Sequence, residues 1–233
     1  MSPYKKDGRE RREFKYFRKN FKGMALFKEE PKFLESLVTN GPRYLFKAVD
    51  KKYRITSKIL CDIGCSYGTN LLYCAPGSYG IEMDKKKAEV ARNLGLKIFE
   101  RDFLKDNIED LPSPDFIWCS AVLEHVDSPF IFIKKMFCLL KPGGLLAIYV
   151  PTIPLLPWLK IIPKFGKYIS GYNNQEHIYA FVPSTLKFIC ERAGFKTIEI
   201  SPFYPNFLKI FNKIPIFNRL IGRCVYIGEK PRV

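Results

Sequence analysis

The sequence predicts an α/β fold in which a doubly wound, mostly parallel sheet is covered by helices on both faces. Short apolar runs recur along the chain and are followed by polar residues or glycine, a pattern typical of buried parallel strands. The first run ends in Leu60 and is followed by Asp62, Gly64 and Gly68. Two glycines at this spacing indicate a tight turn at which a nucleotide-like ligand can approach the backbone. We expect a helix to begin at Thr69.

The later elements follow in the order that a doubly wound sheet requires. Further strands are expected at 79–84, 96–100, 115–120 and 145–150, with another that ends at Ile200. Helices are expected over 31–53, 130–140 and 183–192. The segment Lys141-Pro142-Gly143-Gly144 closes the second of these helices, because proline and glycine end a helix.

The turn around Gly64 has competing interpretations. A Walker loop would need a Gly-Lys-Ser/Thr sequence, and a dinucleotide fingerprint would need a third glycine near Ser66; neither is present. A purely structural turn between strand and helix is a further alternative. Glu82 favours a ligand site, because an acid about 20 residues beyond the glycines can accept hydrogen bonds from both ribose hydroxyls of a nucleotide.

Taken in order, these motifs resemble those of the class I S-adenosylmethionine (SAM) dependent methyltransferases, in particular their ubiquinone-type branch. The resemblance covers residues 58–150 well and residues 176–200 more loosely. It implies a Rossmann-like methyltransferase fold with a seven-stranded sheet, SAM as the cofactor, and methyl transfer as the activity. The segments that carry it are Asp62-x-Gly64-x-x-x-Gly68, Glu82, Asp102, Leu123-Glu124-His125-Val126 and Leu139-Leu140-Lys141-Pro142-Gly143-Gly144.

The resemblance also implies which residues hold the cofactor. Asp62 would orient the loop and the methionine amino group, Glu82 would fix the ribose, and Asp102 or Phe103 would contact adenine. Ser66 stands where the family usually has a middle glycine. The full set of expected cofactor-binding residues is Asp62, Gly64, Cys65, Ser66, Gly68, Glu82, Met83, Asp102, Phe103 and Ser120.

Both histidines follow a glutamate, in Glu124-His125 and Glu176-His177. A histidine can accept a proton from a hydroxyl acceptor near neutral pH, so His125 and His177 are the candidate catalytic residues. The alternative for each is a capping or packing role. Some ubiquinone-type O-methyltransferases carry Glu-x-x-Glu-His at the first position and bind a divalent ion. Ala121 replaces the first of those glutamates here, so no metal site is expected.

Positive charge is concentrated outside the cofactor motifs. The chain carries a formal net charge of +16. Residues 1–32 hold 11 Lys/Arg against 5 Asp/Glu, residues 33–159 hold 16 against 14, and residues 160–233 hold 12 against 4. A localised excess suggests a polyanionic partner such as RNA, DNA or an anionic membrane surface. A generally basic proteome, or solvated helix faces, would explain the charge without a partner.

The chain is expected to divide into a basic N-terminal arm at 1–32 and a methyltransferase domain at 33–233. Aromatic residues at helical spacing in the arm favour docking on the domain, although basic residues interleaved with aromatics can also bind nucleic acid. A hydrophobic and basic insertion at about 151–176 is expected to cover the acceptor pocket. A basic amphipathic segment at about 203–222 can pack on the core or lie in a membrane interface.

Several features bear on location. The longest apolar stretch, 145–159, is shorter than the ~20 residues of a membrane-spanning helix. The first residues are charged, so no signal peptide is expected. No Cys-x-x-Cys pair is present, and the cysteines in apolar settings are expected to be buried, reduced thiols: Cys61, Cys65, Cys119, Cys138 and Cys190. We expect a cytoplasmic protein, with peripheral contact to an anionic membrane as an alternative.

Three functions stay open on this basis. The first is methyl transfer to a small or lipid-linked acceptor, at a hydroxyl oxygen or at carbon, such as a quinone precursor or a glycolipid. The second is RNA methylation, which the basic appendages favour. Against it, the fourth strand ends in Ser120-Ala121-Val122 and lacks the Asn/Asp-Pro-Pro-Tyr/Phe motif of many nucleobase amine methyltransferases. The third is SAM binding without turnover, which the intact Gly64, Gly68 and Glu82 argue against. The sequence predicts no oligomeric state.

Overall fold

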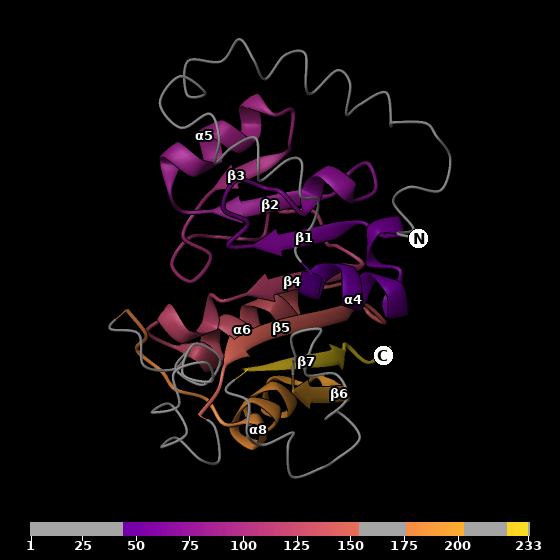
Figure 1. Cartoon of the computed structure of the whole chain (residues 1–233), viewed down its shortest axis with the longest axis vertical. Coiled ribbons are helices and arrows are strands. Elements are labelled where there is room, and N and C mark those ends of the chain that lie inside the picture. The colour runs from indigo at the N-terminus through magenta and orange to yellow at the C-terminus, as the bar shows by residue number, and fades with distance from the viewer. Residues whose placement is uncertain (1–43, 154–175, 203–222, 233) are drawn as a thin grey trace, which may run out of the picture.

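A computed structural model describes residues 44–153, 176–202 and 223–232. Seven strands form one sheet in the order β3-β2-β1-β4-β5-β7-β6 (Figure 1). The first five pair in parallel, and β7 runs antiparallel to both β5 and β6. The predicted doubly wound, mostly parallel, seven-stranded sheet is therefore confirmed. The strands are β1 (Leu60–Ile63), β2 (Tyr79–Glu82), β3 (Ile98–Glu100), β4 (Phe116–Ser120), β5 (Leu145–Pro151), β6 (Lys196–Pro202) and β7 (Arg223–Glu229).

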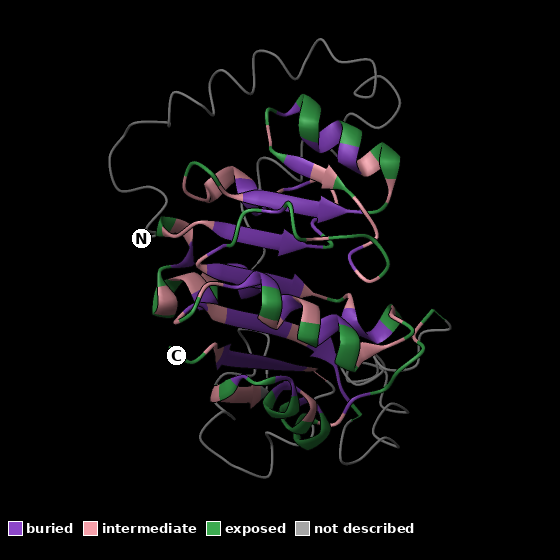
Figure 2. Cartoon of the chain, turned by 180° about the vertical axis from the view of Figure 1, so that it is seen from behind, coloured by how far each residue is buried: buried purple, intermediate pink, exposed green. Residues whose placement is uncertain are grey.

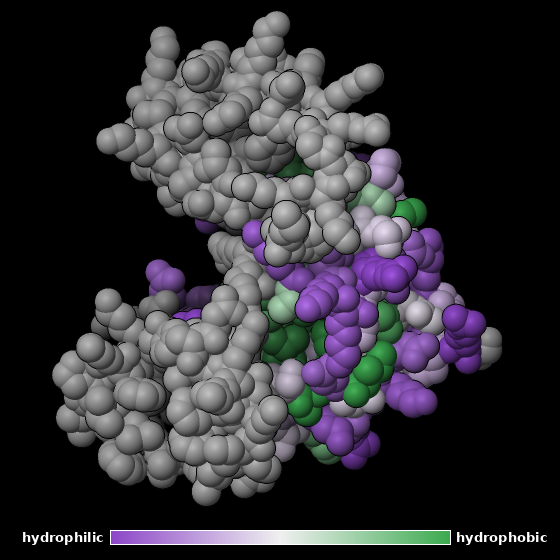
Figure 3. Space-filling view, turned by 45° about the vertical axis from the view of Figure 1, so that its right-hand side comes forward, coloured by the Kyte–Doolittle hydropathy of each residue, from purple (hydrophilic) through white to green (hydrophobic). Residues whose placement is uncertain are grey.

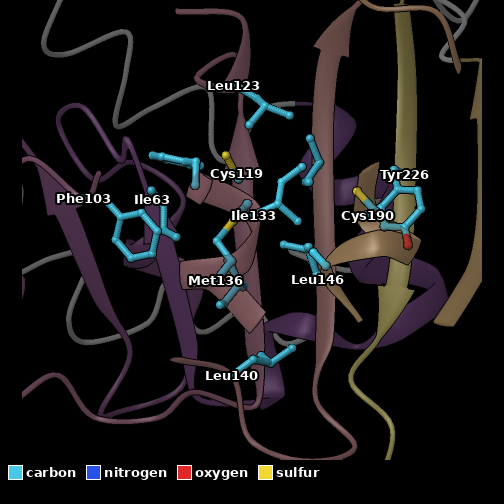
Figure 4. Close-up of a cluster of buried hydrophobic side chains, with 14 of the residues drawn as sticks. Ile63, Phe103, Cys119, Leu123, Ile133, Met136, Leu140, Leu146, Cys190 and Tyr226 are labelled. Carbon is cyan, nitrogen blue, oxygen red and sulfur yellow. The ribbon is translucent and has the colours of Figure 1, made fainter. Parts of the chain in front are cut away.

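Helices cover both faces of the sheet, because successive side chains of a strand point to opposite faces and those of β1, β2 and β4 are buried on both. On one face, α6 (Pro129–Leu139) packs on the central strands and α8 (Pro183–Ala193) packs on β7 and β6, with Ile133, Met136 and Leu146 in the core on this face (Figure 4). On the other face, α4 (Tyr44–Tyr53) and α5 (Lys85–Asn93) cover the sheet. The parallel strands are buried along most of their length (Figure 2).

The strand order fixes where a ligand can bind. The chain runs outward from β1 through β2 to β3 and then returns to place β4 on the other side of β1. The arrowheads of β1, β2, β4 and β5 point to the same edge of the sheet (Figure 1). In open α/β sheets, ligands bind at the carboxyl edge where the strand order reverses, which here is between β1 and β4.

Three predicted elements differ. The first strand was expected to end at Leu60, whereas β1 begins there and runs to Ile63. The helix expected to begin at Thr69 is only a short 3₁₀ turn, Leu71–Tyr73. Pro76 disfavours helical geometry at the residue before it, and Gly77 has a φ of +92°, so the chain turns toward β2 instead of completing an α-helix. The second strand also ends earlier than expected, at Glu82, because the Asp84 side chain caps α5 by accepting a hydrogen bond from Lys87 N (3.1 Å).

The cysteines are free thiols and form no disulfide among the described residues. Four of the five expected to be buried are so, together with Cys224, whereas Cys138 is exposed on α6, so the prediction of burial was wrong there. Cys138 falls on the outer face of its helix, which sequence apolarity alone does not reveal. Burial raises the pKa of the Cys224 thiol to about 12, so this thiol stays protonated near neutral pH.

Several predicted segments lie outside the described residues. These are the basic arm at 1–32, the first part of the helical region 31–53, most of the insertion at 151–176, and the amphipathic segment at 203–222. Within the described part, none of the helices is long and apolar enough to cross a membrane. On the side seen in Figure 3, the described surface is mainly hydrophilic and surrounds a smaller hydrophobic area.

Candidate active site

Backbone hydrogen bonds hold the glycine bend after β1 against β2. The N–H groups of Gly64 and Cys65 both donate to Ile81 O, at 2.8 and 3.2 Å. Gly64 has a φ of +71°, a conformation that only glycine adopts without strain. A Cβ at Gly64 would overlap Val122 Cγ2, from the segment after β4. The bend therefore has to be glycine, and it lies directly against the end of the fourth strand.

Glu82 closes the bend from the neighbouring strand. Its Oε2 accepts a hydrogen bond from Ser66 N (2.7 Å), and its Oε1 accepts one from Asp84 N (2.9 Å). The side chain is 7% exposed. Each carboxylate oxygen has two lone pairs, so both oxygens keep accepting capacity after these bonds. The structure thus places the predicted carboxylate at the predicted bend, in a position to bind further donors.

Asp62 is buried at the end of β1, beside an amide that sequence reasoning missed. Asn70 Nδ2 donates to Asp62 Oδ2 (3.2 Å), and Asn70 Oδ1 is buried without a hydrogen-bond partner among the described residues. A carboxylate and an amide oxygen side by side form an acceptor set suited to an ammonium group. The only sequence signal for Asn70 was its place two residues after Gly68, where a helix was expected.

The structure separates the other expected cofactor residues into edge and core positions. Ser120 ends β4 and is half-buried, and Met83 is 71% exposed just beyond Glu82. Cys65, in contrast, is buried, with its Sγ against Gly80. Any contact of Cys65 with a ligand would therefore be made by its backbone.

Asp102 and Phe103 also take different positions. Asp102 Oδ1 accepts a hydrogen bond from Leu104 N (2.9 Å), which shapes the turn after β3. The Phe103 ring is buried and packs edge-on against Phe132, with ring centroids 4.9 Å apart. Figure 4 shows the Phe103 ring beside Ile63 in the core. Only the backbone of Phe103 could therefore contact adenine. Asp102 lies at the carboxyl edge of the sheet.

The two histidines, distant in the sequence, meet at this edge. Their rings contact edge-to-face, with centroids 4.8 Å apart. His125 Nδ1 lies 2.9 Å from Glu176 O. Because a carbonyl oxygen only accepts, Nδ1 must carry the proton, and Nε2 of the neutral ring then holds a lone pair. His125 therefore presents a basic nitrogen in a fixed tautomer.

Glu124 completes this cluster and is the glutamate that remains of the Glu-x-x-Glu-His motif that Ala121 interrupts. Its side chain is 1% exposed, and its Oε1 lies 4.0 Å from His125 Nε2. Burial raises the pKa of this carboxyl above its usual range. The Glu124 backbone carbonyl accepts hydrogen bonds from Ile178 N (2.9 Å) and Tyr179 N (3.1 Å). These bonds tie the segment that carries His177 to the end of β4.

Comparison with known proteins assigns the chain to a family. A family model described as a methyltransferase domain matches residues 32–200. The chain belongs to this methyltransferase family.

Relatives and solved structures agree with the assignment. A tRNA U34 carboxymethyltransferase of Helicobacter pylori (strain P12) is 29% identical over 172 residues, which are 72% of this chain and 58% of the relative. A ubiquinone biosynthesis O-methyltransferase of Vibrio parahaemolyticus is 29% identical over 113 residues, 45% of this chain and 48% of the relative. The chain thus spans less than two thirds of these relatives.

Among solved structures, a SAM-dependent methyltransferase from Archaeoglobus fulgidus has a TM-score of 0.59 at 21% identity, covering 85% of this chain and 99% of that one. A Haemonchus contortus phosphoethanolamine N-methyltransferase in complex with S-adenosylhomocysteine has a TM-score of 0.59 at 17% identity, covering 81% and 52%. At these identities the likeness shows the fold. The family match makes residues 32–200 a methyltransferase domain, and the solved structures show that its fold is that of known methyltransferases.

The requirement for glycine at the bend can be measured directly. Gly64→Ala should lower the free energy of unfolding by a positive-φ cost of about 1–2 kcal/mol plus about 1–3 kcal/mol for overlap with Val122. Gly95→Ala is the matched control, because Gly95 has a φ of +77° but nothing within 4 Å of its Cβ position. Urea unfolding of both variants should show the larger loss at Gly64. Equal losses would mean that the bend does not pack on the segment after β4.

Proposed function

We propose that the protein transfers the methyl group of SAM to a hydroxyl oxygen of a small or lipid-linked acceptor. The observation that carries this proposal is the fixed tautomer of His125, which leaves a basic Nε2 beside the cofactor edge. Val122 touches the glycine bend, and the turn Leu123–His125 follows it at once. A proton acceptor next to the cofactor loop is what O-methylation requires, whereas a neutral amine acceptor can react without one.

The cofactor is assigned to the bend and its neighbours. Glu82 would accept hydrogen bonds from the two ribose hydroxyls through its remaining lone pairs. Asp62 and Asn70 would hold the methionine ammonium group between two buried acceptors. Asp102 would accept from the adenine amine at the end of β3, and the exposed Met83 would pack on the adenine ring. The bend itself supplies backbone groups that no Cβ obstructs.

The chemistry asked of the protein is mainly alignment. SAM, when bound, supplies a methyl group on a sulfonium that leaves as a neutral thioether. The glycine bend and Glu82 fix the position of that methyl group. Holding two reactants in line can lower the activation free energy by about 7–11 kcal/mol in favourable cases. His125 Nε2 takes the hydroxyl proton as the new carbon–oxygen bond forms, while His177 packs against its ring and limits its rotation.

Apolar side chains around the histidines favour an acceptor with an apolar body. Ile178 is 57% exposed and Ile153 is 40% exposed. Ile178 N binds the Glu124 carbonyl, so Ile178 lies next to the cluster, and Ile153 N binds the carbonyl of Phe181, four residues after His177 (2.8 Å). The Tyr179 hydroxyl donates to Asp127 O (3.0 Å), which holds its ring in place at the same rim. A quinone-like or lipid-linked substrate would bury this exposed apolar area.

RNA is the second candidate acceptor. The curated relatives named tRNA U34 carboxymethyltransferases and the net charge of +16 favour it. The transferred group, however, is proposed to be methyl in either case.

The acceptor class can be identified by labelling. The protein is incubated with methyl-labelled SAM and with lipid, RNA, protein and small-molecule fractions of a cell extract. Label should enter the lipid or small-molecule fraction and behave as a methyl ether. Label in RNA would instead establish the second candidate, and no label in any fraction would contradict both.

The ribose assignment makes a separate prediction. Glu82→Ala should weaken SAM binding at least tenfold in calorimetric titration, because it removes both ribose acceptors and frees the Ser66 amide. Glu100→Ala is the control, since Glu100 ends the adjacent strand but pairs with Arg92 at the surface. Unchanged affinity in the Glu82 variant would discard the assignment.

The role of His125 is tested on the acceptor that labelling identifies. His125→Ala should lower kcat by about 10²–10⁴-fold, the usual contribution of a positioned base. The dissociation constant for SAM should stay unchanged, because His125 belongs to the acceptor side. His177→Ala should have a smaller effect on kcat. A His125 variant with normal turnover would exclude this histidine as the base.

A further inference from the structure

We propose that Lys135 is a positioning residue for the adenine ring of the cofactor and gives the site a preference for a 6-amino purine over a 6-oxo purine. The role rests on the proposed function, in which Asp102 accepts a hydrogen bond from the adenine amine. Asp102 lies in the loop after β3, whereas Lys135 lies on α6, which follows the turn Leu123–His125. The sequence gives no sign that these two parts of the chain meet.

The loop after β3, residues 102–106, closes through its own hydrogen bonds. Asp102 N donates to Asp106 Oδ2 (2.8 Å), and Asp106 N donates to Asp102 O (2.8 Å). Asp102 Oδ1 accepts hydrogen bonds from Leu104 N (2.9 Å) and Lys105 N (3.3 Å). Asp102 Oδ2 lies 3.5 Å from the ammonium of Lys105, whose side chain is 72% exposed, so this second oxygen keeps capacity for a further donor.

Lys135 ties this loop to α6. Its Nζ donates to Leu104 O (2.9 Å) and to Asp106 O (2.6 Å). The ammonium also lies over the Phe103 ring, 5.7 Å from its centre, and that ring packs on Phe132 of the same helix. A cation over an aromatic face is a favourable contact. One half-buried lysine therefore contacts three residues of this five-residue loop.

A loop held in this way keeps Asp102 in one orientation before the cofactor binds. Asp106 is bonded to Asp102 through both main chain and side chain, and its carbonyl is bonded to Lys135. Loss of the ammonium would release this end of the loop, and the loop would then have to be ordered when the cofactor binds. Such ordering weakens binding. Lys135 thus acts through Asp102, and not by contact with the adenine ring.

The purine substituent at position 6 is the group that this carboxylate distinguishes. An amine donates a hydrogen bond to Asp102, whereas the oxygen of a 6-oxo purine has no proton to donate. A hydrogen bond to a charged group corresponds to about 10–100-fold in affinity. The preference requires Asp102 to lie within hydrogen-bonding distance of the amine. A displaced Asp102 would therefore weaken binding of the amino purine and change binding of the oxo purine little.

Lys134, the neighbouring residue on α6, offers a matched control. Its Nζ donates to Ala193 O (3.2 Å) and lies over the Phe137 ring, 5.1 Å from its centre. These are the same two kinds of contact that Lys135 makes, but they join α6 to the end of α8 and not to the loop after β3. Substitution of Lys134 should therefore leave the preference for the amino purine unchanged.

The preference is measured as the ratio of two dissociation constants in calorimetric titrations of the full chain. The ligands are S-adenosylhomocysteine and S-inosylhomocysteine, which carries an oxygen in place of the adenine amine. The wild-type protein should bind the adenosyl compound at least about tenfold more tightly. Lys135→Met should weaken binding of this compound about tenfold and change binding of the inosyl compound less than about twofold. Lys135→Arg, which keeps the charge and the donors, should retain most of the ratio, and Lys134→Met should retain all of it.

Two results would overturn the role of Lys135. These are an unchanged ratio in Lys135→Met, or equal weakening for both compounds, which would mean that the lysine only stabilises the fold. Urea unfolding checks that each variant is folded, and Lys135→Gln replaces the methionine variant if that one is not.

Asp102→Ala separates this failure from a failure of the proposed adenine site. The variant should lose the preference. If it keeps the wild-type ratio, or if the wild type shows no preference, adenine does not bind at Asp102 and both assignments fall. If Asp102→Ala loses the preference while Lys135→Met keeps it, the adenine site stands and only the role of Lys135 is wrong.

Discussion

The hydrogen bond between Ser66 N and Glu82 Oε2 is the contact on which the active site depends. It joins the bend after β1 to the end of β2, beside the point between β1 and β4 where the strand order reverses. The same carboxylate holds the Asp84 amide at the start of α5, so one side chain sets both the loop and the helix that follow it. A cofactor that binds here meets a loop already held in place, and little ordering has to accompany binding.

The sheet was readable from the sequence because its strands are buried on both faces. Continuous apolar runs leave little ambiguity about where a strand lies. Its end is less certain, because β1 continues to Ile63 beyond the expected end at Leu60, and β2 ends at Glu82 before the expected end at Asp84. The helix expected after Gly68 does not form, because the tendency of Leu71 and its neighbours to be helical gives way to the turn imposed by Pro76. The antiparallel β7 had no separate signal, since a short apolar run near the chain end fits many roles.

Individual side chains were harder to place than elements. Phe103 follows a strand at the binding edge, yet its ring turns into the core and packs on Phe132. The position of a residue after a strand predicts that its backbone lies at the edge of the sheet. The direction of its side chain depends on packing against elements that are distant in the sequence. For the same reason Asn70 was missed, because its contact with Asp62 exists only once the expected helix is replaced by a tight turn.

The histidine cluster shows how contacts between distant segments give common residues a specific geometry. Either Glu-His pair alone is compatible with a capping role. Together, the Glu176 carbonyl sets the tautomer of His125, and the Glu124 carbonyl fixes the segment of His177. The result is a basic nitrogen, a second imidazole and a buried carboxylate on the acceptor side of the cofactor loop. The proposed methyl transfer to an oxygen draws on this arrangement.

The most direct test of the account is a crystal structure of the protein with S-adenosylhomocysteine. We expect both ribose hydroxyls within hydrogen-bonding distance of Glu82, the amino group beside Asp62 and Asn70, and the sulfur on the side of the bend that faces His125. A product bound away from Glu82, or with its sulfur turned away from the histidines, would contradict the account.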